Sequence, residues 1–447
     1  MAREKPDALW MGVVADDITG SNDIGVMFAK AGLRVHVYSF PGEPGSLPAG
    51  AAAQEPPDIL ILDTNSRLDS PQSAYEKVFA ATRRLQAAGC PRFFKKTCSV
   101  FRGNIGAEFD AMLDALGLNF AVVVLGFPKN GRITREGLHY VHGKLLEQSE
   151  FRNDPIHPMC SSNLVDILQG QTARRVRSLD YRLISRGPQA LEEQLDTLRP
   201  EGGYLILDVT CQEDLRTVAL AAAKEPALCG SSALAEELPY AWEAAGSTGA
   251  PAGLPPRGDL GVLCVAGSLM PQTAGQLEHL REQGCPLVWL DSLRLFEPEE
   301  REAEIERLAQ EMASMLLAGQ DAALAAPNTA EAVARTQAAG ARRGFDRTAT
   351  ARQVSAALAE TAARLVARCG LKRLVAAGGE TSAAVCARLG VTGLQVWKEI
   401  QPGLPSCLSL TSEPMLLVLK SGSFGSLSFL EEAIQHLRSE GSTEKLL

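Results

Sequence analysis

Short apolar runs that end at polar clusters alternate with helix-like segments along this chain, and this alternation constrains the fold more than any other feature. Each apolar run has the length of a buried strand, and the segments between them have helical periodicity. Because parallel strands need a crossover connection, the alternation predicts an α/β fold with a largely parallel, doubly wound sheet. In the first half we expect strands at residues 9–15, 58–62, 92–96 and 120–126, and helices at 21–31, 70–88 and 105–116.

A segment rich in Gly, Pro, Ala and Ser interrupts this pattern at residues 243–258 and has no apolar periodicity, as is typical of a linker. Beyond it, strand-like and helical segments alternate again. The sequence therefore predicts two α/β domains, residues 1–245 and 257–447, each with a largely parallel sheet flanked by helices. In the second domain we expect strands at 260–266, 286–290, 371–376, 394–397 and 415–419, and helices at 271–282, 354–368 and 427–438.

The charge and the cysteine pattern exclude several classes of function. A net charge of −9 and a pI near 5.4 disfavour nucleic-acid binding, because phosphates demand a basic surface. No apolar run has the length of a signal-peptide core or a membrane span, so we expect a soluble, cytoplasmic protein with no membrane partner. The ten cysteines include no Cys-x-x-Cys pair and no histidine cluster, which predicts neither a metal site nor a disulfide framework. A homo-oligomer is compatible with this composition.

Polar clusters follow several expected strands of the first half. Since the carboxyl ends of parallel strands share one edge of the sheet, these clusters are expected to form a single pocket. Asp17 is either a helix cap or a carboxylate that accepts the proton of a hydroxyl. Arginine can bind a carboxylate with two parallel hydrogen bonds, so the basic residues in this pocket favour a substrate with a carboxylate and hydroxyls. The clusters are residues 16–17, 63–67, 95–102 and 128–134, and the basic residues are Arg67, Lys95, Lys96 and Arg102.

Three small-residue turns of the second half join a strand to a helix. They are residues 266–268, 377–382 and 420–425. Glycines let a phosphate approach the backbone, and a helix amino terminus supplies N–H donors. The three turns together predict a nucleotide pocket. Residues 126–132 nearly match a P-loop, but Arg132 and Ile133 replace the required Lys and Ser or Thr, so Arg132 is kept only as a candidate anion contact.

These motifs are specific enough to indicate a family. Seven short blocks of these motifs together resemble the corresponding blocks of the four-carbon acid sugar kinases, and they occur in the family's order over nearly the whole chain. The resemblance implies an ATP-dependent kinase with a sugar-acid-binding amino-terminal domain and a nucleotide-binding carboxyl-terminal domain. It implies phosphorylation at the terminal 4-hydroxyl of a tetronate, for which D-threonate or a close stereoisomer is favoured. The blocks are VADDITGSND (14–23), DTNSR (63–67), KKTCSVFRGNIG (95–106), GRIT (131–134), GS (267–268), AGGET (377–381) and KSGSFG (420–425).

The resemblance also implies roles for individual residues. From the chemistry of phosphoryl transfer, Asp17 is expected to orient or deprotonate the attacking hydroxyl and Asp16 to be structural, as the cap of the following helix. The sequence leaves the general base open among Asp16, Asp17 and more distant acids. Mg²⁺ is expected to bridge the ATP phosphates without a metal site of the chain's own. The expected contacts to the sugar acid are Asp17, Arg67, Lys95, Lys96, Thr97 and Cys98, and those to ATP are Ser268, Gly378, Gly379, Glu380, Thr381, Gly422 and Gly425.

The sequence departs from the family pattern in its third block, and two alternative functions have to be compared with the kinase. Many relatives read Lys-x-Asp-Ser-Thr-Leu-Arg-Gly in the third block, whereas here Cys98 replaces the aspartate, so the substrate is expected to differ from that of the commonest members. A catalytically silent sugar-acid-binding or regulatory protein of the same fold is an alternative, against which the retained Asp16 and Asp17 argue. A dinucleotide-dependent oxidoreductase would need a Gly-x-Gly-x-x-Gly turn after a strand, and none of the expected strands has one.

Overall fold

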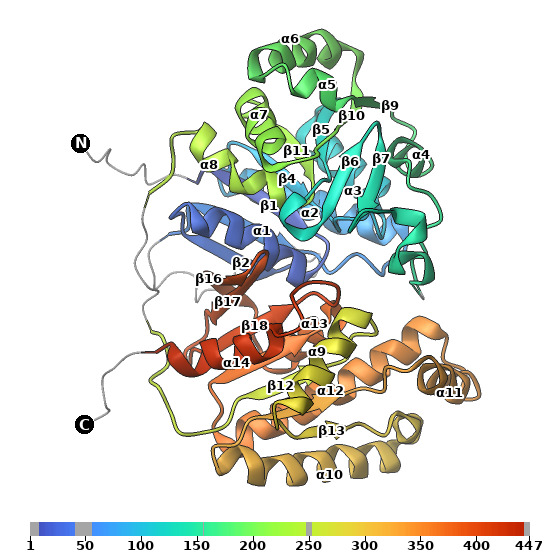
Figure 1. The fold of residues 1–447 in the computed structure, drawn as a ribbon, viewed down its shortest axis with the longest axis vertical. Helices are drawn as coiled ribbons and strands as arrows, with labels where there is room; N and C mark the ends of the chain where they lie inside the picture. Colours follow the sequence, from blue (N-terminus) through green and yellow to red (C-terminus); the bar gives the residue numbers. More distant parts are fainter. Residues whose placement is uncertain (1–8, 41–55, 155, 247–252, 442–447) are drawn as a thin grey trace. The chain divides into compact units, whose positions relative to one another are not determined.

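The computed structural model describes residues 9–40, 56–154, 156–246 and 253–441 (Figure 1). The chain divides into two compact units, Met1–Gly249 and Ala250–Leu447, called the first and the second unit below. Each unit is an α/β structure of strands and helices. Among the described residues, no helix is both long enough and apolar enough to cross a membrane.

The first unit contains a sheet in the order β2-β3-β1-β4-β11-β5-β10-β9, in which every neighbouring pair is parallel. This confirms the parallel sheet predicted from the alternating pattern. The chain runs from β1 to β2 and β3 on one side and then crosses to β4 on the other, so the strand order reverses at β1. Ligand sites of open α/β sheets lie at the carboxyl ends of the strands at such a point. The strands are β1 (Met11–Ala15), β2 (Val35–Ser39), β3 (Ile59–Asp63), β4 (Phe93–Lys96), β5 (Phe120–Val124), β9 (Val176–Leu179), β10 (Gly203–Leu207) and β11 (Ala227–Gly230).

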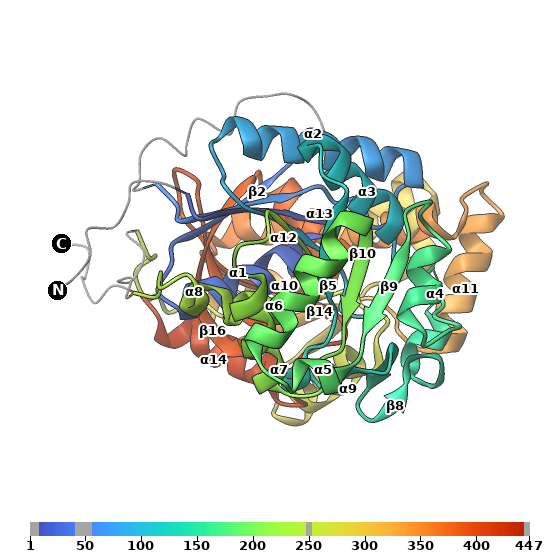
Figure 2. The same ribbon diagram turned by 90° about the horizontal axis from the view of Figure 1, so that it is seen from above.

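Helices cover both faces of this sheet. In Figure 2, α2 and α3 lie on one side of the sheet and α1 and α7 on the other. The helix α2 shows why such segments fold and dock: Ser70 caps its amino terminus, and its buried residues recur at helical spacing as one apolar stripe. The helices of the unit are α1 (Ile18–Lys30), α2 (Pro71–Ala87), α3 (Ile105–Leu116), α4 (Leu164–Gln169), α5 (Tyr181–Ile184), α6 (Pro188–Leu198), α7 (Gln212–Ala222) and α8 (Leu238–Ala241).

A small antiparallel sheet follows β5, where the sequence predicted only a polar loop. It consists of β6 (Arg132–Arg135), β7 (Leu138–Val141) and β8 (Lys144–Leu145). The turn between β6 and β7 is Glu136-Gly137, with both residues at positive φ, and His142-Gly143 repeats this geometry between β7 and β8. Two-residue turns of this kind match the twist of a hairpin. The sequence prediction missed them because neither turn carries the Asn-Gly or Asp-Gly signal.

The second unit has the strand order β13-β14-β12-β15-β18-β17-β16. The neighbouring pairs β13–β14, β14–β12, β12–β15 and β15–β18 are parallel, whereas β17 is antiparallel to both β18 and β16. The predicted strand at 394–397 is thus half of a long hairpin. The strands are β12 (Leu263–Ala266), β13 (Leu287–Trp289), β14 (Ala322–Ala325), β15 (Arg373–Ala377), β16 (Gly393–Gln401), β17 (Leu404–Ser409) and β18 (Leu416–Lys420); the helices are α9 (Pro271–Glu282), α10 (Pro298–Leu317), α11 (Ala330–Ala341), α12 (Arg347–Cys369), α13 (Gly379–Arg388) and α14 (Phe429–Ser439).

Candidate active site

Asp17 forms the amino-terminal cap of α1, directly after the end of β1. Its backbone is extended, its Oδ1 accepts a hydrogen bond from the Gly20 N–H at 2.5 Å, and its Oδ2 accepts one from the Thr19 hydroxyl at 3.1 Å. Aspartate is among the most favourable residues at this position. The prediction that Asp16 caps the helix is therefore wrong. The cap is one residue later, because the Asp16 carboxylate is bound elsewhere.

Asp16 is fully buried and is bound by Arg67, which follows β3. Arg67 Nε donates to Asp16 Oδ2 at 2.8 Å and Nη2 donates to Oδ1 at 2.9 Å, while Nη1 donates to Asp17 Oδ2. Two parallel bonds to one carboxylate are the strongest geometry that arginine offers. Arg67 was expected to contact the carboxylate of a substrate; in this structure it binds two carboxylates of its own chain.

Lys95 and Lys96 end strand β4 and point to opposite faces of the sheet, as successive strand residues must. Lys95 is fully buried, with Nζ 2.9 Å from Glu108 Oε2 on α3. Lys96 Nζ lies 3.4 Å from Asp23 Oδ2 on α1 and donates to the Thr97 carbonyl at 2.9 Å. Both ammonium groups, expected at the substrate, therefore neutralise buried acids. The sequence analysis assigned no role to Glu108 or Asp23.

The acids around β1 differ in how readily they take a proton. Burial raises the pKa of Asp16, but the charges of Arg67, Lys95 and Lys96 outweigh it and hold that pKa well below its usual range. Burial raises the pKa of Asp23 to about 6, although Lys96 lowers it. Burial, with the charges of Asp17 and Asp16, raises the pKa of Asp63 to about 7. Asp16 is therefore the weakest base of the three.

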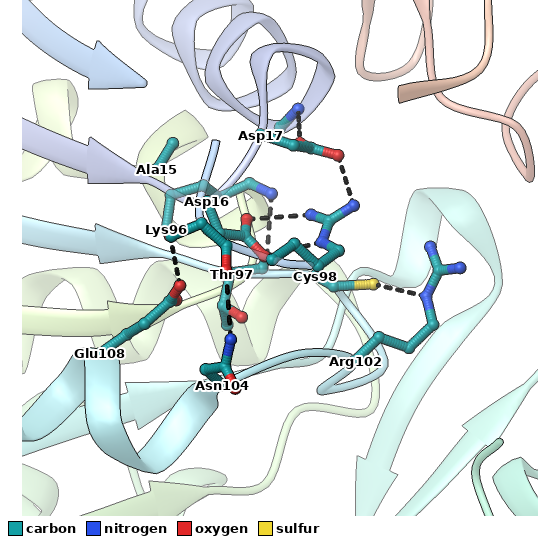
Figure 3. A network of polar contacts seen from close by, with 12 residues as sticks. Ala15, Asp16, Asp17, Lys96, Thr97, Cys98, Arg102, Asn104 and Glu108 are labelled. Atoms are coloured by element: carbon teal, nitrogen blue, oxygen red, sulfur yellow. Dashed lines mark hydrogen bonds and ion pairs between the residues drawn. The ribbon is translucent and has the colours of Figure 1, made fainter. Parts of the chain in front are cut away.

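Cys98 lies between two guanidinium groups. Arg102 Nε donates to Cys98 Sγ at 3.4 Å (Figure 3). Arg102 Nη1 donates to Asp154 Oδ2 at 2.7 Å. Burial raises the pKa of the Cys98 thiol, but the charges of Arg102 and Arg67 lower it below its usual value. The thiol thus occupies an electropositive position, which is where the aspartate of many relatives would be expected. Arg102, which the sequence showed only as one cation among several, contacts both Cys98 and Asp154.

The loops that carry these residues are held together by side-chain contacts. Asn104 Nδ2 donates to the carbonyls of Ser66 and Asp69 at 3.1 and 2.9 Å, which joins the loop after β4 to the loop after β3. Gly103, at φ +105, lies so close to Arg67 that an added Cβ would come within 3.1 Å of its Cγ. The loops after β3 and β4 thus contact each other, as the sequence predicted.

Several buried polar atoms in this cluster have no hydrogen-bond partner among the described residues. They are both amide atoms of Asn22, Oδ1 of Asp23 and the hydroxyl of Thr97. Such atoms are uncommon and call for a ligand, a water or a catalytic role. Asn22 and Asp23 stand in the block that carried the family resemblance, which is the signal that could have identified them. Arg132 is also buried; Cys98 and Asp23 are close enough to act on its pKa, which burial lowers.

The three small-residue turns of the second unit also meet. The Gly267 N–H donates to the Ala377 carbonyl at 3.1 Å, and the Gly378 N–H donates to the Lys420 carbonyl at 2.8 Å. An added Cβ on Gly422 would lie 2.2 Å from Ser268 Oγ. Gly378, at φ +120, caps α13, whose first turn contains Glu380 and Thr381. Glycine is required here both for this backbone conformation and for the close approach of the turns.

Comparisons with known proteins agree with this arrangement. Residues 11–238 match the family model of a sugar-binding N-terminal domain, and residues 263–430 match that of a nucleotide-binding C-terminal domain. The chain is 34% identical to the 3-oxo-tetronate kinase of Cupriavidus necator over 443 residues, covering 96% of this chain and 97% of that one. It is 35% identical to the 3-oxo-tetronate kinase of Methylobacterium radiotolerans over 439 residues, with 96% and 99% covered.

Solved structures show the same fold. A Salmonella typhimurium LT2 protein superposes with a TM-score of 0.76 at 31% identity, with 95% of this chain and 98% of that chain covered. A Haemophilus influenzae protein superposes with a TM-score of 0.68 at 29% identity, with 96% and 100% covered. Both halves of the chain and their order are thus those of one family, and the chain belongs to the four-carbon acid sugar kinases.

Proposed function

We propose that this kinase transfers the γ-phosphoryl group of ATP to the terminal 4-hydroxyl of a four-carbon sugar acid, with 3-oxo-tetronate as the acid in preference to D-threonate. Residues 1–245 would bind the acid, and residues 257–447 would bind the nucleotide. The preference for 3-oxo-tetronate rests on the names of the curated relatives. The observation that carries the proposal is the Arg67–Asp16–Asp17 cluster at the strand-order reversal of a domain that matches a sugar-binding family.

The substrate carboxylate is proposed to bind Arg67 and Arg102. Asp16 and Asp17 occupy three of the five N–H donors of Arg67, and both guanidinium side chains are about 15% exposed. Cys98 lies between them and would contact the same end of the substrate. Lys95 and Lys96 would act indirectly, by holding Glu108 and Asp23 in place. The Thr97 hydroxyl would then be available to a substrate hydroxyl.

Asp17 is proposed to accept the proton of the 4-hydroxyl as the phosphoryl group is transferred. Phosphoryl transfer depends mainly on in-line positioning and charge stabilisation, and a carboxylate at the attacking hydroxyl fills the one acid–base role. The helix cap and Arg67 fix the orientation of the Asp17 carboxylate. Asp16 is less suited, because it is fully buried and the charges of Arg67, Lys95 and Lys96 lower its pKa. Asp23 is the second candidate, since its Oδ1 has no partner among the described residues.

The phosphates of ATP are proposed to lie along Ser268, residues 378–381 and the glycines Gly422 and Gly425. These turns combine a hydroxyl, a helix amino terminus and backbone that a phosphate can approach. Among the described residues, no group of three or more His, Cys, Asp or Glu side chains is arranged to hold a metal. Mg²⁺ is proposed to be bound chiefly by the ATP phosphates, where it would neutralise their charge.

The test is an ATP-consumption assay with 3-oxo-tetronates, the threonates and the erythronates as acceptors. We expect the highest kcat/KM with a 3-oxo-tetronate, and ³¹P NMR of the product should show phosphorus coupled to the C4 methylene protons. A higher kcat/KM for D-threonate would replace the proposed substrate within the same family. Phosphate on another carbon would overturn the assignment of the 4-hydroxyl. The absence of turnover with every tetronate would favour the silent binding protein.

A further inference from the structure

The loop of residues 421–426, between β18 and α14, has its carbonyl groups bound from inside the second unit. Lys420 Nζ donates to the carbonyls of Ser421 at 2.7 Å and Gly422 at 3.0 Å. The Thr273 hydroxyl donates to the Gly422 carbonyl at 2.8 Å. These contacts fix the carbonyl groups of the first part of the loop.

Gln276 holds the second part of the loop. Its Nε2 lies 3.1 Å from the carbonyl oxygens of Phe424 and Gly425 and 2.8 Å from that of Ser426. Gln276 and Thr273 are three residues apart on α9 and therefore project from one face of that helix. Lys420, Thr273 and Gln276 together bind the carbonyls of every loop residue from 421 to 426 except Ser423.

Lys420 is an unusual anchor, because it is fully buried and forms no salt bridge in the described part of the chain. Its acceptors are Thr273 Oγ1 and two carbonyls, which match the three hydrogens of an ammonium group. Burial lowers its pKa to about 7. An unpaired buried ammonium is costly, and an apolar side chain would fill the same space at lower cost. The charge of Lys420 lies on the side of the loop to which the carbonyls of Ser421 and Gly422 point.

Three amide groups of this loop are left for another partner, whereas the Phe424 N–H donates to the Ser421 carbonyl and the Ser426 N–H donates to Gln401 Oε1. No hydrogen bond in the described part of the chain uses the N–H of Gly422, Ser423 or Gly425. Gly422 packs against Ser268, so the loop borders the other two small-residue turns. Successive backbone N–H groups that face one way form a concave site for an anion.

We propose that Lys420, Thr273 and Gln276 are positioning residues that turn the carbonyls of loop 421–426 inward and so present its N–H groups to the phosphates of the nucleotide. This inference rests on the proposed ATP site and adds the three side chains that shape it. None of the three needs to touch the nucleotide. Their effect should therefore be confined to ligands that carry phosphate groups.

The test compares Thr273→Val, which removes the hydroxyl at nearly constant volume, with Thr273→Ser, which keeps it. Loss of the hydroxyl, which donates to the Gly422 carbonyl and accepts from Lys420, should raise the KM for ATP about three- to tenfold in Thr273→Val, and the KM should rise by less than about twofold in Thr273→Ser. Lys420→Met, which removes a charged donor, should raise the KM for ATP by about tenfold or more. The KM for the sugar acid should stay within about twofold of wild type in all three variants. An equal rise in both Michaelis constants, or equal behaviour of the Val and Ser variants, would overturn the inference.

Inorganic tripolyphosphate provides an independent readout, since it carries phosphates without a base or sugar. Its dissociation constant by calorimetry should rise in Thr273→Val by the same factor as the KM for ATP, whereas the inhibition constant of adenosine should not change. If wild type binds tripolyphosphate and Thr273→Val binds it more weakly, the inference holds even if no tetronate is phosphorylated, in which case the proposed function alone has failed. Unchanged tripolyphosphate binding in Thr273→Val would contradict the inference whatever the substrate.

Discussion

The guanidinium group of Arg67 is bound to the carboxylate of Asp16 by two parallel hydrogen bonds, Nε to Oδ2 at 2.8 Å and Nη2 to Oδ1 at 2.9 Å. Because Asp17 accepts from the third nitrogen, one arginine fixes both acids that follow β1. A lysine cannot reproduce this planar fork, since its ammonium is a single point charge. Arg67 therefore links the geometry of the predicted proton acceptor to the predicted carboxylate site.

Replacement of Arg67 should affect the sugar acid and not the nucleotide. Loss of a charge-assisted contact costs roughly 1.5 to 3 kcal/mol, so Arg67→Ala should raise the KM for the sugar acid about tenfold to a hundredfold. Arg67→Lys should be nearly as impaired, and kcat should fall in both because Asp17 loses a partner. Steady-state kinetics with each substrate varied in turn measure these effects, with Arg83→Ala on the exposed face of α2 as the control. A change confined to the KM for ATP would place the carboxylate elsewhere.

Asn variants separate the roles of the acids. Asp17→Asn keeps a residue that caps helices well but removes the charge, so kcat should fall by on the order of a hundredfold or more while the KM for the sugar acid changes little. Asp23→Asn should retain more turnover if Asp17 is the proton acceptor. Single-turnover rates of both variants, with thermal melts as a check on folding, decide between them. Normal turnover in Asp17→Asn with loss in Asp23→Asn would transfer the role to Asp23.

Gly422 should tolerate no side chain. Its added Cβ would lie 2.2 Å from Ser268 Oγ and 2.9 Å from Met270 Cγ, so Gly422→Ala must displace the turn that contains Ser268. We expect a rise of about tenfold or more in the dissociation constant for ATP, comparable to the loss of a charged hydrogen bond, with sugar-acid binding unchanged. Gly258→Ala is the matched control, because its Cβ would meet no atom within 4 Å. Equal affinity of the two variants for ATP in calorimetry would argue against a phosphate site at this turn.

Lys420 should give the protein a specific pH dependence of stability. Burial lowers the Lys420 pKa from 10.5 to about 7, so between pH 7 and 10.5 the unfolded chain holds a proton that the folded chain has lost. The unfolded state then binds more protons, and the free energy of unfolding rises with pH in this window, by at most about 1.4 kcal/mol per pH unit. Lys420→Met lacks this contribution. Urea unfolding at pH 7, 8, 9 and 10 should show the stability of wild type increasing relative to the variant, and a constant difference would contradict the buried-ammonium interpretation.

The local pattern of the sequence determined the α/β alternation, the parallel sheet of the first unit and the loops in which the site residues lie. Apolar runs of strand length that end in polar clusters carry this information locally. The local pattern did not predict two strands. The strand β14 is a run of alanines and one leucine, and β17 forms only as the partner of β16 and β18. Their strand character comes from burial and pairing, which depend on neighbours far away in the chain.

What the tertiary structure decided is which charges meet. The sequence placed Asp16 beside Asp17 and Lys95 beside Lys96 but did not show which side chain each of them binds. After the end of β1, Asp16 binds Arg67 and Asp17 caps α1. The pleat of β4 sends its two lysines to acids on opposite faces of the sheet. These ion pairs join partners that are 13 to 73 residues apart in the sequence and are brought together only by the fold, because the free energy of a buried charge is set by what surrounds it in space.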